Sequence, residues 1–333
     1  MTGPIKDLIW LSGDRSQLGR RLTRPAIYVL LATVVVVLGF NWPIMATGLK
    51  SITPIWMGVF RLSGAALVVI VIGAISGNMK VPPRRDLPMI ASVAVFRLAT
   101  VFFLVFTALR LVPPGRSSVI VWTTSLWTVP IAAVFLGERM SGRRWIGLAL
   151  GIAGLVVLFE PWGFMWDEPG VVFGHALLIV AAITNAATAV HIRGHRWTIT
   201  PLQAIPWQLV GAVIPLTILG LVVDGPPVID WTPQLAWIVV YQGVLATGTA
   251  FWAQIVVLRN LAAVSTNLTL MGVPVVGVVS SAILLGEEVT TALAIGLVLI
   301  IIGVALNLLS DRGVADQPPT DSEADLQPFK EAL

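Results

Sequence analysis

Two arginines lie in the middle of long apolar segments. Arg61 and Arg97 each stand about ten residues into a run long enough to span a membrane. An arginine at mid-bilayer costs roughly 2.5–3.5 kcal/mol on the insertion scale, and no Asp or Glu lies within any predicted span to neutralise it. Because a guanidinium fits a carboxylate or phosphate, we interpret the two arginines as an electropositive site for an anionic group. The alternative is that they donate to backbone carbonyls freed at helix kinks such as Pro43 and Pro130.

Other polar and aromatic side chains in the apolar segments suit the same site. Side-chain amides both donate and accept hydrogen bonds, which orients a polar ligand. Deep tryptophans can line an aromatic pocket. The competing interpretations are hydrogen bonds between helices, typically worth about 0.6 kcal/mol, and tryptophans that face lipid or packed helices. The predicted substrate-binding residues are Arg97, Arg61, Asn41, Asn185, Gln208, Tyr241, Trp122 and Trp252.

The sequence lacks the patterns of an enzyme. It has no cysteine and shows no metal-ligand spacing, Ser/His/Asp pattern, phosphate-binding glycine loop or paired membrane carboxylates. We therefore predict no catalytic residue, no metal and no cofactor. His175 and His191 could shuttle protons, but local hydrogen bonding is the better interpretation near span ends. With so few candidates for proton coupling, exchange or facilitated diffusion is favoured.

The composition is that of an all-α polytopic membrane protein. Of 333 residues, 56% are hydrophobic and 11% charged, against about 25% charged in soluble domains. Apolar runs of roughly 20 residues recur throughout. The ten predicted spans are 25–47, 52–75, 87–109, 117–136, 144–159, 170–191, 202–223, 235–258, 264–285 and 291–310.

An internal duplication divides the chain. Leu-Gly-Glu at 136–138 returns at 285–287, and Ala-Leu-Arg at 108–110 returns as Val-Leu-Arg at 257–259, each at an offset of 149. Each unit holds five spans, so the two units must cross the membrane in opposite directions, a design common in transporters with a midplane site. The predicted domains are a cytoplasmic segment (1–24), repeat one (25–160), inverted repeat two (161–310) and a disordered cytoplasmic tail (311–333).

The basic residues predict the orientation. With both termini in the cytoplasm, sixteen of the 21 Lys and Arg fall on inner segments and three on outer loops. The net charge of +4 therefore indicates membrane topology and not nucleic-acid binding. The predicted location is the cell (inner) membrane, with the lipid bilayer and a small-molecule substrate as partners.

Glycines predict two further features. Gly137 and Gly286 suit the left-handed C-terminal position of a helix, so the Leu-Gly-Glu turns have a structural and not a chemical role. Gly147 and Gly151 form a G-x-x-x-G step that permits close helix approach. Internal packing is the favoured role, and a homodimer contact is the alternative.

With these features, the chain resembles the EamA-type members of the drug/metabolite transporter superfamily over roughly residues 26–310. The motifs are Asn-Trp-Pro at 41–43, Thr-Pro at 53–54 with Arg61 seven residues later, and the repeated Leu-Arg and Leu-Gly-Glu pairs. Arg97 departs from the pattern, since its counterpart is Ala246.

The resemblance implies a substrate path enclosed by spans 1–4 and 6–9, and export or exchange of small polar metabolites such as amino acids or organic anions. The alternatives are an importer of nucleoside- or sugar-phosphate-like solutes, or a channel or structural partner that transports nothing.

Overall fold

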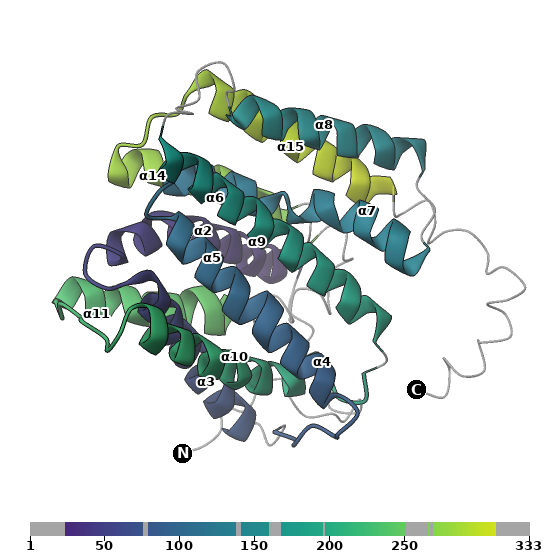
Figure 1. The fold of residues 1–333 in the computed structure, drawn as a ribbon. Coiled ribbons are helices and arrows are strands. Elements are labelled where there is room, and N and C mark those ends of the chain that lie inside the picture. Colours follow the sequence, from purple (N-terminus) through teal and green to yellow (C-terminus); the bar gives the residue numbers. More distant parts are fainter. Residues whose placement is uncertain are drawn as a thin grey trace, which may run out of the picture.

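The computed structural model describes residues 24–75, 79–137, 141–159, 168–195, 197–250, 266 and 269–310. Within these residues the chain is helical and has no strand (Figure 1). Eight of the described helices are long and apolar enough to cross a membrane. By the length and composition of these helices, the prediction of an all-α polytopic membrane protein is confirmed.

The first half supplies five of these apolar helices, and their bounds lie close to the predicted ones. The third and fourth are built from shorter pieces in direct succession. The elements are α2 (Arg24–Gly48), α3 (Pro54–Ile75), α4 (Leu87–Ser92) with η2 (Val93–Thr100) and α5 (Val101–Ala108), α6 (Pro114–Trp122) with α7 (Thr124–Leu136), and α8 (Gly142–Phe159).

The second half supplies the remaining described helices. Its described elements are α9 (Pro169–Gly194), α10 (Pro201–Val223), α11 (Pro233–Val240) with η3 (Tyr241–Thr249), α14 (Gly272–Leu285) and α15 (Thr291–Ser310). The predicted spans 235–258 and 264–285 are described only in part, because 251–265, 267 and 268 lie outside the described residues.

The helix ends follow from local chemistry. Proline occupies a first-turn position in α6, α9, α10 and α11, where its missing N–H costs nothing. Gly137 and Gly286 end α7 and α14 with φ of 67° and 69°, the left-handed conformation that glycine adopts without strain. The structural role predicted for these two glycines is confirmed.

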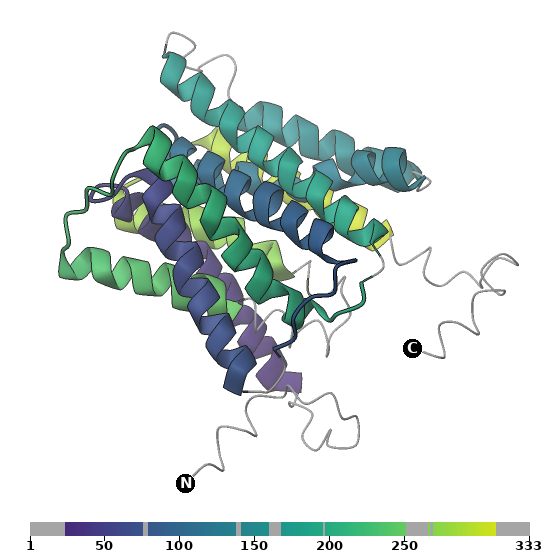
Figure 2. The same ribbon diagram turned by 60° about the horizontal axis from the view of Figure 1, so that its bottom comes forward.

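Helices from the two halves pack against one another throughout. The most extensive pairs are α8 with α15, α2 with α14, α3 with α10, and α3 with η3. The α8–α15 pair lies along one edge of the bundle in Figure 1, and the turned view in Figure 2 also places α8 at an edge.

Glycines bring α8 and α15 into backbone contact. A Cβ added to Gly147 would lie 2.6 Å from the carbonyl oxygen of Gly303, and one added to Gly154 would lie 2.8 Å from that of Gly296. Each glycine thus packs against the counterpart of the other, since 147 and 154 correspond to 296 and 303 at the offset of 149. The internal packing predicted for Gly147 and Gly151 is confirmed, since a Cβ added to Gly303 would also lie 2.7 Å from the Gly151 nitrogen.

The third helix of each half contains a π-helical segment. η2 covers Val93–Thr100 and η3 covers Tyr241–Thr249, so the two segments end at the offset of 149 and their starts differ from it by one residue. η2 packs on α10 and η3 packs on α3. π-Helical turns are rare in proteins, and those that occur often lie at functional sites. The helices around η2 and η3 are therefore the first place to look for a site.

Candidate functional site

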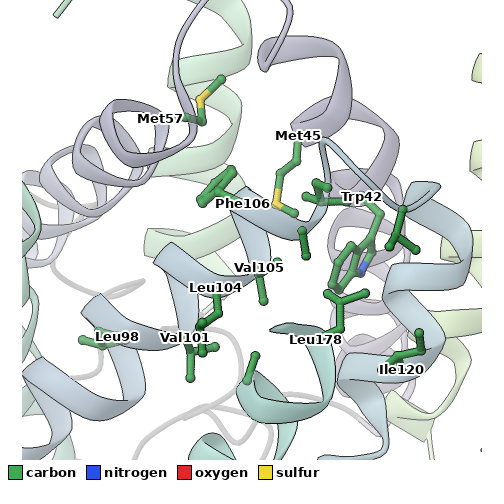
Figure 3. Close-up of a cluster of buried hydrophobic side chains, with 14 of the residues drawn as sticks. Trp42, Met45, Met57, Leu98, Val101, Leu104, Val105, Phe106, Ile120 and Leu178 are labelled. Atoms are coloured by element: carbon green, nitrogen blue, oxygen red, sulfur yellow. The ribbon is translucent and has the colours of Figure 1, made fainter. Parts of the chain in front are cut away.

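A cavity of about 170 Å³ lies between α2, α3, α5, α6 and α14. We call it the central cavity. Trp42 and Met45 of α2 lie opposite Val105 and Phe106 of α5 around this region (Figure 3). Its lining residues are Leu38, Asn41, Trp42, Met45, Arg61, Val101, Phe102, Val105, Phe106, Val121, Trp122 and Val273. Apart from Asn41 and Arg61 the lining is apolar and aromatic, which is typical of a small-molecule site.

Arg61 is the one charged residue in this lining. Its side chain is only 8% exposed. Its Nε donates to the Thr247 hydroxyl at 2.9 Å, and a terminal nitrogen donates to the Met45 sulfur at 2.8 Å. The guanidinium carbon lies 4.8 Å from the centre of the Phe102 ring, a cation–π distance.

These partners hold the Arg61 guanidinium without neutralising it. A hydroxyl, a thioether and an aromatic ring carry no formal charge, and no acidic side chain pairs with Arg61 among the described residues. A guanidinium has five N–H donors, and a thioether sulfur is only a weak acceptor. Arg61 is therefore a positioned cation with donor capacity left for an anionic ligand. The alternative role was donation to backbone carbonyls freed by prolines. The described contacts of Arg61 are instead all with side chains.

Asn41 supplies the complementary chemistry. Its Nδ2 donates to the same Met45 sulfur at 3.0 Å, so one sulfur contacts both Asn41 and Arg61. Its Oδ1 is buried and has no hydrogen-bond partner among the described residues. A buried acceptor left unpaired costs about 1–3 kcal/mol. The cavity thus offers an unused acceptor beside a fixed cation.

The structure brings together three of the eight predicted residues, namely Arg61, Asn41 and Trp122. Trp122 is the last residue of α6, directly before the break at Thr123 that separates α6 from α7. Trp252 lies outside the described residues.

The other four predicted residues are described, but they do not line the central cavity. Tyr241 donates its hydroxyl to the Val37 carbonyl at 2.8 Å and ties η3 to α2. Asn185 approaches the Thr124 hydroxyl at 3.5 Å. Gln208 is half-buried on α10.

Arg97 does not line the central cavity that contains Arg61. It is half-buried in η2, and the described part of the chain shows no hydrogen bond or ion pair to its side chain. Of the two arginines predicted to form one site, only Arg61 therefore lines the central cavity.

Sequence reasoning missed the residues that hold Arg61. Met45, Phe102 and Thr247 are ordinary residues of a membrane helix, and nothing in their types indicates a guanidinium partner. Thr247 lies in the π-helical segment of the opposite half. The only usable signal was the deep position of Phe102 in the third predicted span.

Glu287 fixes the helix that carries Trp122. Its two carboxylate oxygens accept hydrogen bonds from the backbone N–H groups of Gly115 and Arg116, at 2.7 and 3.1 Å. These groups open α6, where an unpaired N–H and the helix dipole both favour an anion. Burial raises the pKa of the Glu287 carboxyl above its ordinary value, although the two N–H groups favour the charged form. The predicted structural role of this turn therefore includes a contact between the two halves.

Asp86 joins two loops at the other end of the bundle. Its fully buried carboxylate accepts from the Thr198 hydroxyl at 2.5 Å, the Thr198 N–H at 3.1 Å and the His195 Nε2 at 2.9 Å. The Thr198 hydroxyl, followed by His195 and the Thr198 N–H, holds the pKa of the Asp86 carboxyl below its ordinary value against the opposing effect of burial. The contact ties the loop before α4 to the loop after α9.

Known proteins are similar to this chain in sequence, and a solved structure is similar to it in fold. The sequence model of the EamA-like transporter family matches residues 25–160 and 172–309. The uncharacterized transporter YoaV of Bacillus subtilis is 24% identical over 83% of this chain and 94% of its own length. A probable amino-acid metabolite efflux pump of Escherichia coli is 28% identical over 85% of this chain and 95% of its own length.

Two further relatives extend the comparison. A probable terminal-alkyne amino-acid exporter of Streptantibioticus cattleyicolor is 28% identical over 84% of this chain and 92% of its own length. A solved crystal structure with 19% identity aligns with a TM-score of 0.61 over 88% of this chain and 99% of its own, which supports the fold alone.

Proposed function

The chain belongs to the EamA-like transporter family, and from that premise we propose that it is a secondary transporter of small polar metabolites, such as amino acids or organic anions. We propose export or exchange across the cell (inner) membrane, with both termini in the cytoplasm. Two relatives are named for efflux or export of amino acids or their metabolites, and this supports the substrate class.

The observation that carries the proposal is the pairing of Arg61 with Asn41 in the central cavity. The Arg61 guanidinium suits a carboxylate, and the unpaired Asn41 Oδ1 suits an ammonium group. Both side chains donate to the Met45 sulfur, so the two recognition groups are neighbours. This combination fits the zwitterionic end of an amino acid, while the apolar and aromatic walls accommodate its side chain.

We further propose ten spans arranged as two inverted repeats, with alternating access around the central cavity. The reciprocal contacts of Gly147 with Gly303 and of Gly154 with Gly296 support this symmetry. A second equivalent pair of contacts joins Gly64 to Gly243 and Gly211 to Ala94. The Arg61–Thr247 hydrogen bond joins one proposed repeat to the other. A ligand that binds Arg61 would therefore alter a contact between the two repeats.

The experiment is a counterflow assay in proteoliposomes with a panel of amino acids, organic acids and sugar phosphates. The variants are Arg61→Gln and, as the matched control, Arg110→Gln, an exposed arginine after α5. A hydrogen bond to a charged group contributes about 1.5–3 kcal/mol, so we expect Arg61→Gln to weaken apparent affinity roughly tenfold to a hundredfold. We expect Arg110→Gln to transport as the wild type.

The ligand panel separates the alternatives. Transport of an amino acid but not of its carboxamide supports recognition of the carboxylate. If Arg61→Gln inserts normally and transports every solute at the wild-type rate, Arg61 is structural and the proposed site is wrong. Preference for sugar phosphates would keep the site and replace the substrate class.

A further inference from the structure

A second cavity of about 160 Å³ lies between α7, α8, α9, α14 and α15. We call it the arginine cavity, because Arg144 and Arg193 line it. The remaining lining residues are Trp122, Ser125, Thr128, Val129, Ala132, Leu270, Met271, Pro274, Ile300, Ile301, Val304, Asn307 and Leu308. Of the eight substrate-binding residues predicted from the sequence, only Trp122 lines this cavity.

The two arginines and two hydroxyl groups give the lining of this cavity groups that can bind an anion. Arg144 stands in the first turn of α8, and Arg193 stands at the end of α9. Ser125 and Thr128 of α7 add hydroxyl groups. Two guanidinium groups line one cavity, and a guanidinium group binds carboxylates and phosphates.

Asn307 is the strongest sign of a ligand in this cavity. It is 4% exposed, and neither its Oδ1 nor its Nδ2 has a hydrogen-bond partner among the described residues. Leaving both groups of a buried amide unpaired costs several times the roughly 1–3 kcal/mol of one such group unless something binds them. A Cβ at Gly147 would lie 2.8 Å from the Asn307 Oδ1, so the glycine also makes room for this amide.

The α15 residues around Asn307 make an apolar wall. It consists of Ile300, Ile301, Val304 and Leu308 on one face of α15. A ligand that satisfies the whole cavity therefore has an anionic head and an apolar body. Trp122, next to the break between α6 and α7, lines both this cavity and the central cavity.

We propose that the arginine cavity is a second binding site, for an anion carried on an apolar body. Arg144 and Arg193 bind the anionic head, Asn307 hydrogen-bonds beside it, and the α15 wall covers the apolar part. The ligand can come from the aqueous phase as a carboxylate or from the bilayer as an anionic lipid, and both present the same chemistry.

The test measures binding of benzoate, with benzamide as the neutral match of the same shape. The protein carries Arg61→Gln, which removes the cation of the central cavity, and it is held in phosphatidylcholine nanodiscs. We expect benzoate to raise the unfolding temperature more than benzamide does. Adding Arg144→Gln should weaken benzoate affinity at least tenfold, whereas the adjacent exposed Arg143→Gln should change it less than twofold, because Arg143 does not line the cavity.

Asn307→Leu provides a second variant that keeps the number and branching of the side-chain heavy atoms and removes the amide, and we expect the same loss. The proposal is overturned if Arg144→Gln and Asn307→Leu bind benzoate like their parent, or if benzamide binds equally well. Repeating the titration in nanodiscs that contain phosphatidylglycerol identifies the source. Because an anionic bilayer repels benzoate in general, the Arg144→Gln variant is titrated in both bilayers; a larger loss of benzoate affinity in the parent than in Arg144→Gln assigns the site to a lipid, and an equal loss assigns it to a soluble anion. Transport by Arg61→Gln is a separate readout, so the proposed function can fail while this site stands.

Discussion

Replacing Glu287 by alanine removes the carboxylate that holds the first turn of α6. Two backbone N–H groups, of Gly115 and Arg116, then lose their acceptor. Loss of a helix cap costs about 0.5–2 kcal/mol, and loss of an anion at a helix N-terminus costs about 0.3–1 kcal/mol at exposed sites. Because Glu287 is half-buried, we expect Glu287→Ala to lower the free energy of unfolding by about 1–2 kcal/mol.

The adjacent Glu288 gives the matched control. It is exposed and no hydrogen bond of its side chain is described, so Glu288→Ala should cost less than about 0.5 kcal/mol. Gly115→Ala tests the same contact from the other side, because its Cβ would lie 2.8 and 2.9 Å from the two Glu287 oxygens. Gly115→Ala should therefore destabilise the wild type, and be neutral or stabilising once Glu287 is alanine, since alanine is the better helix former.

The assay is reversible unfolding in mixed micelles by dodecyl sulfate, followed by the fluorescence of the 13 tryptophans. The double-mutant cycle should give a coupling energy of about 1 kcal/mol between positions 115 and 287. Equal losses for Glu287→Ala and Glu288→Ala, or an unchanged effect of Gly115→Ala in both backgrounds, would refute the capping role.

Three further predictions concern pH and packing. The raised pKa of Glu287 means that ionising this buried carboxyl costs part of the stability of the fold as pH rises from the ordinary carboxyl range through the folded-state value, while the hydrogen bonds from the Gly115 and Arg116 N–H groups remain; Glu287→Gln should remove this slope in pH-dependent unfolding, and an identical slope contradicts it. The lowered pKa of Asp86 has the opposite sign: stability is present above the ordinary carboxyl range and falls as pH drops through the folded-state value, so Asp86→Asn should flatten the acid limb, and a parallel curve speaks against the contact. Gly303→Ala places a Cβ 2.5 Å from the Gly147 oxygen and should cost about 1–3 kcal/mol, whereas Gly142→Ala, with nothing within 4 Å, should change stability by less than about 0.5 kcal/mol; equal unfolding curves for the two would disprove tight packing.

The fold was the more predictable part, because bilayer thickness and backbone hydrogen bonding leave few choices. The predicted bounds of the first helix, 25–47, differ by one residue at each end from α2 (Arg24–Gly48). The glycine turns at 137 and 286 were equally accessible, since a positive φ favours one residue type. The π-helical segments were not predicted, because their hydrophobic pattern does not differ from that of an α-helix.

The candidate site was only partly accessible from sequence. Burial of a charge inside a span directed attention to Arg61, and the cavity contains it. The same argument selected Arg97, which lies outside the cavity, because depth in the membrane does not specify which way a side chain faces. Asn307 and the arginine cavity were missed, since an amide near a span end has no distinctive pattern before its neighbours are known.

The central claim, that the Arg61 cavity is the solute path, is tested most directly by thiol labelling. The chain has no cysteine, so Val121→Cys, which lines the central cavity, can be compared with Val71→Cys, 44% exposed on the outside of α3. Only a thiolate reacts with a membrane-impermeant methanethiosulfonate, and it forms only where water enters. We predict that Val121→Cys is labelled, that a transported solute slows the labelling, and that labelled protein no longer transports. Labelling of neither variant, or labelling of Val121→Cys that leaves transport unchanged, would contradict the account.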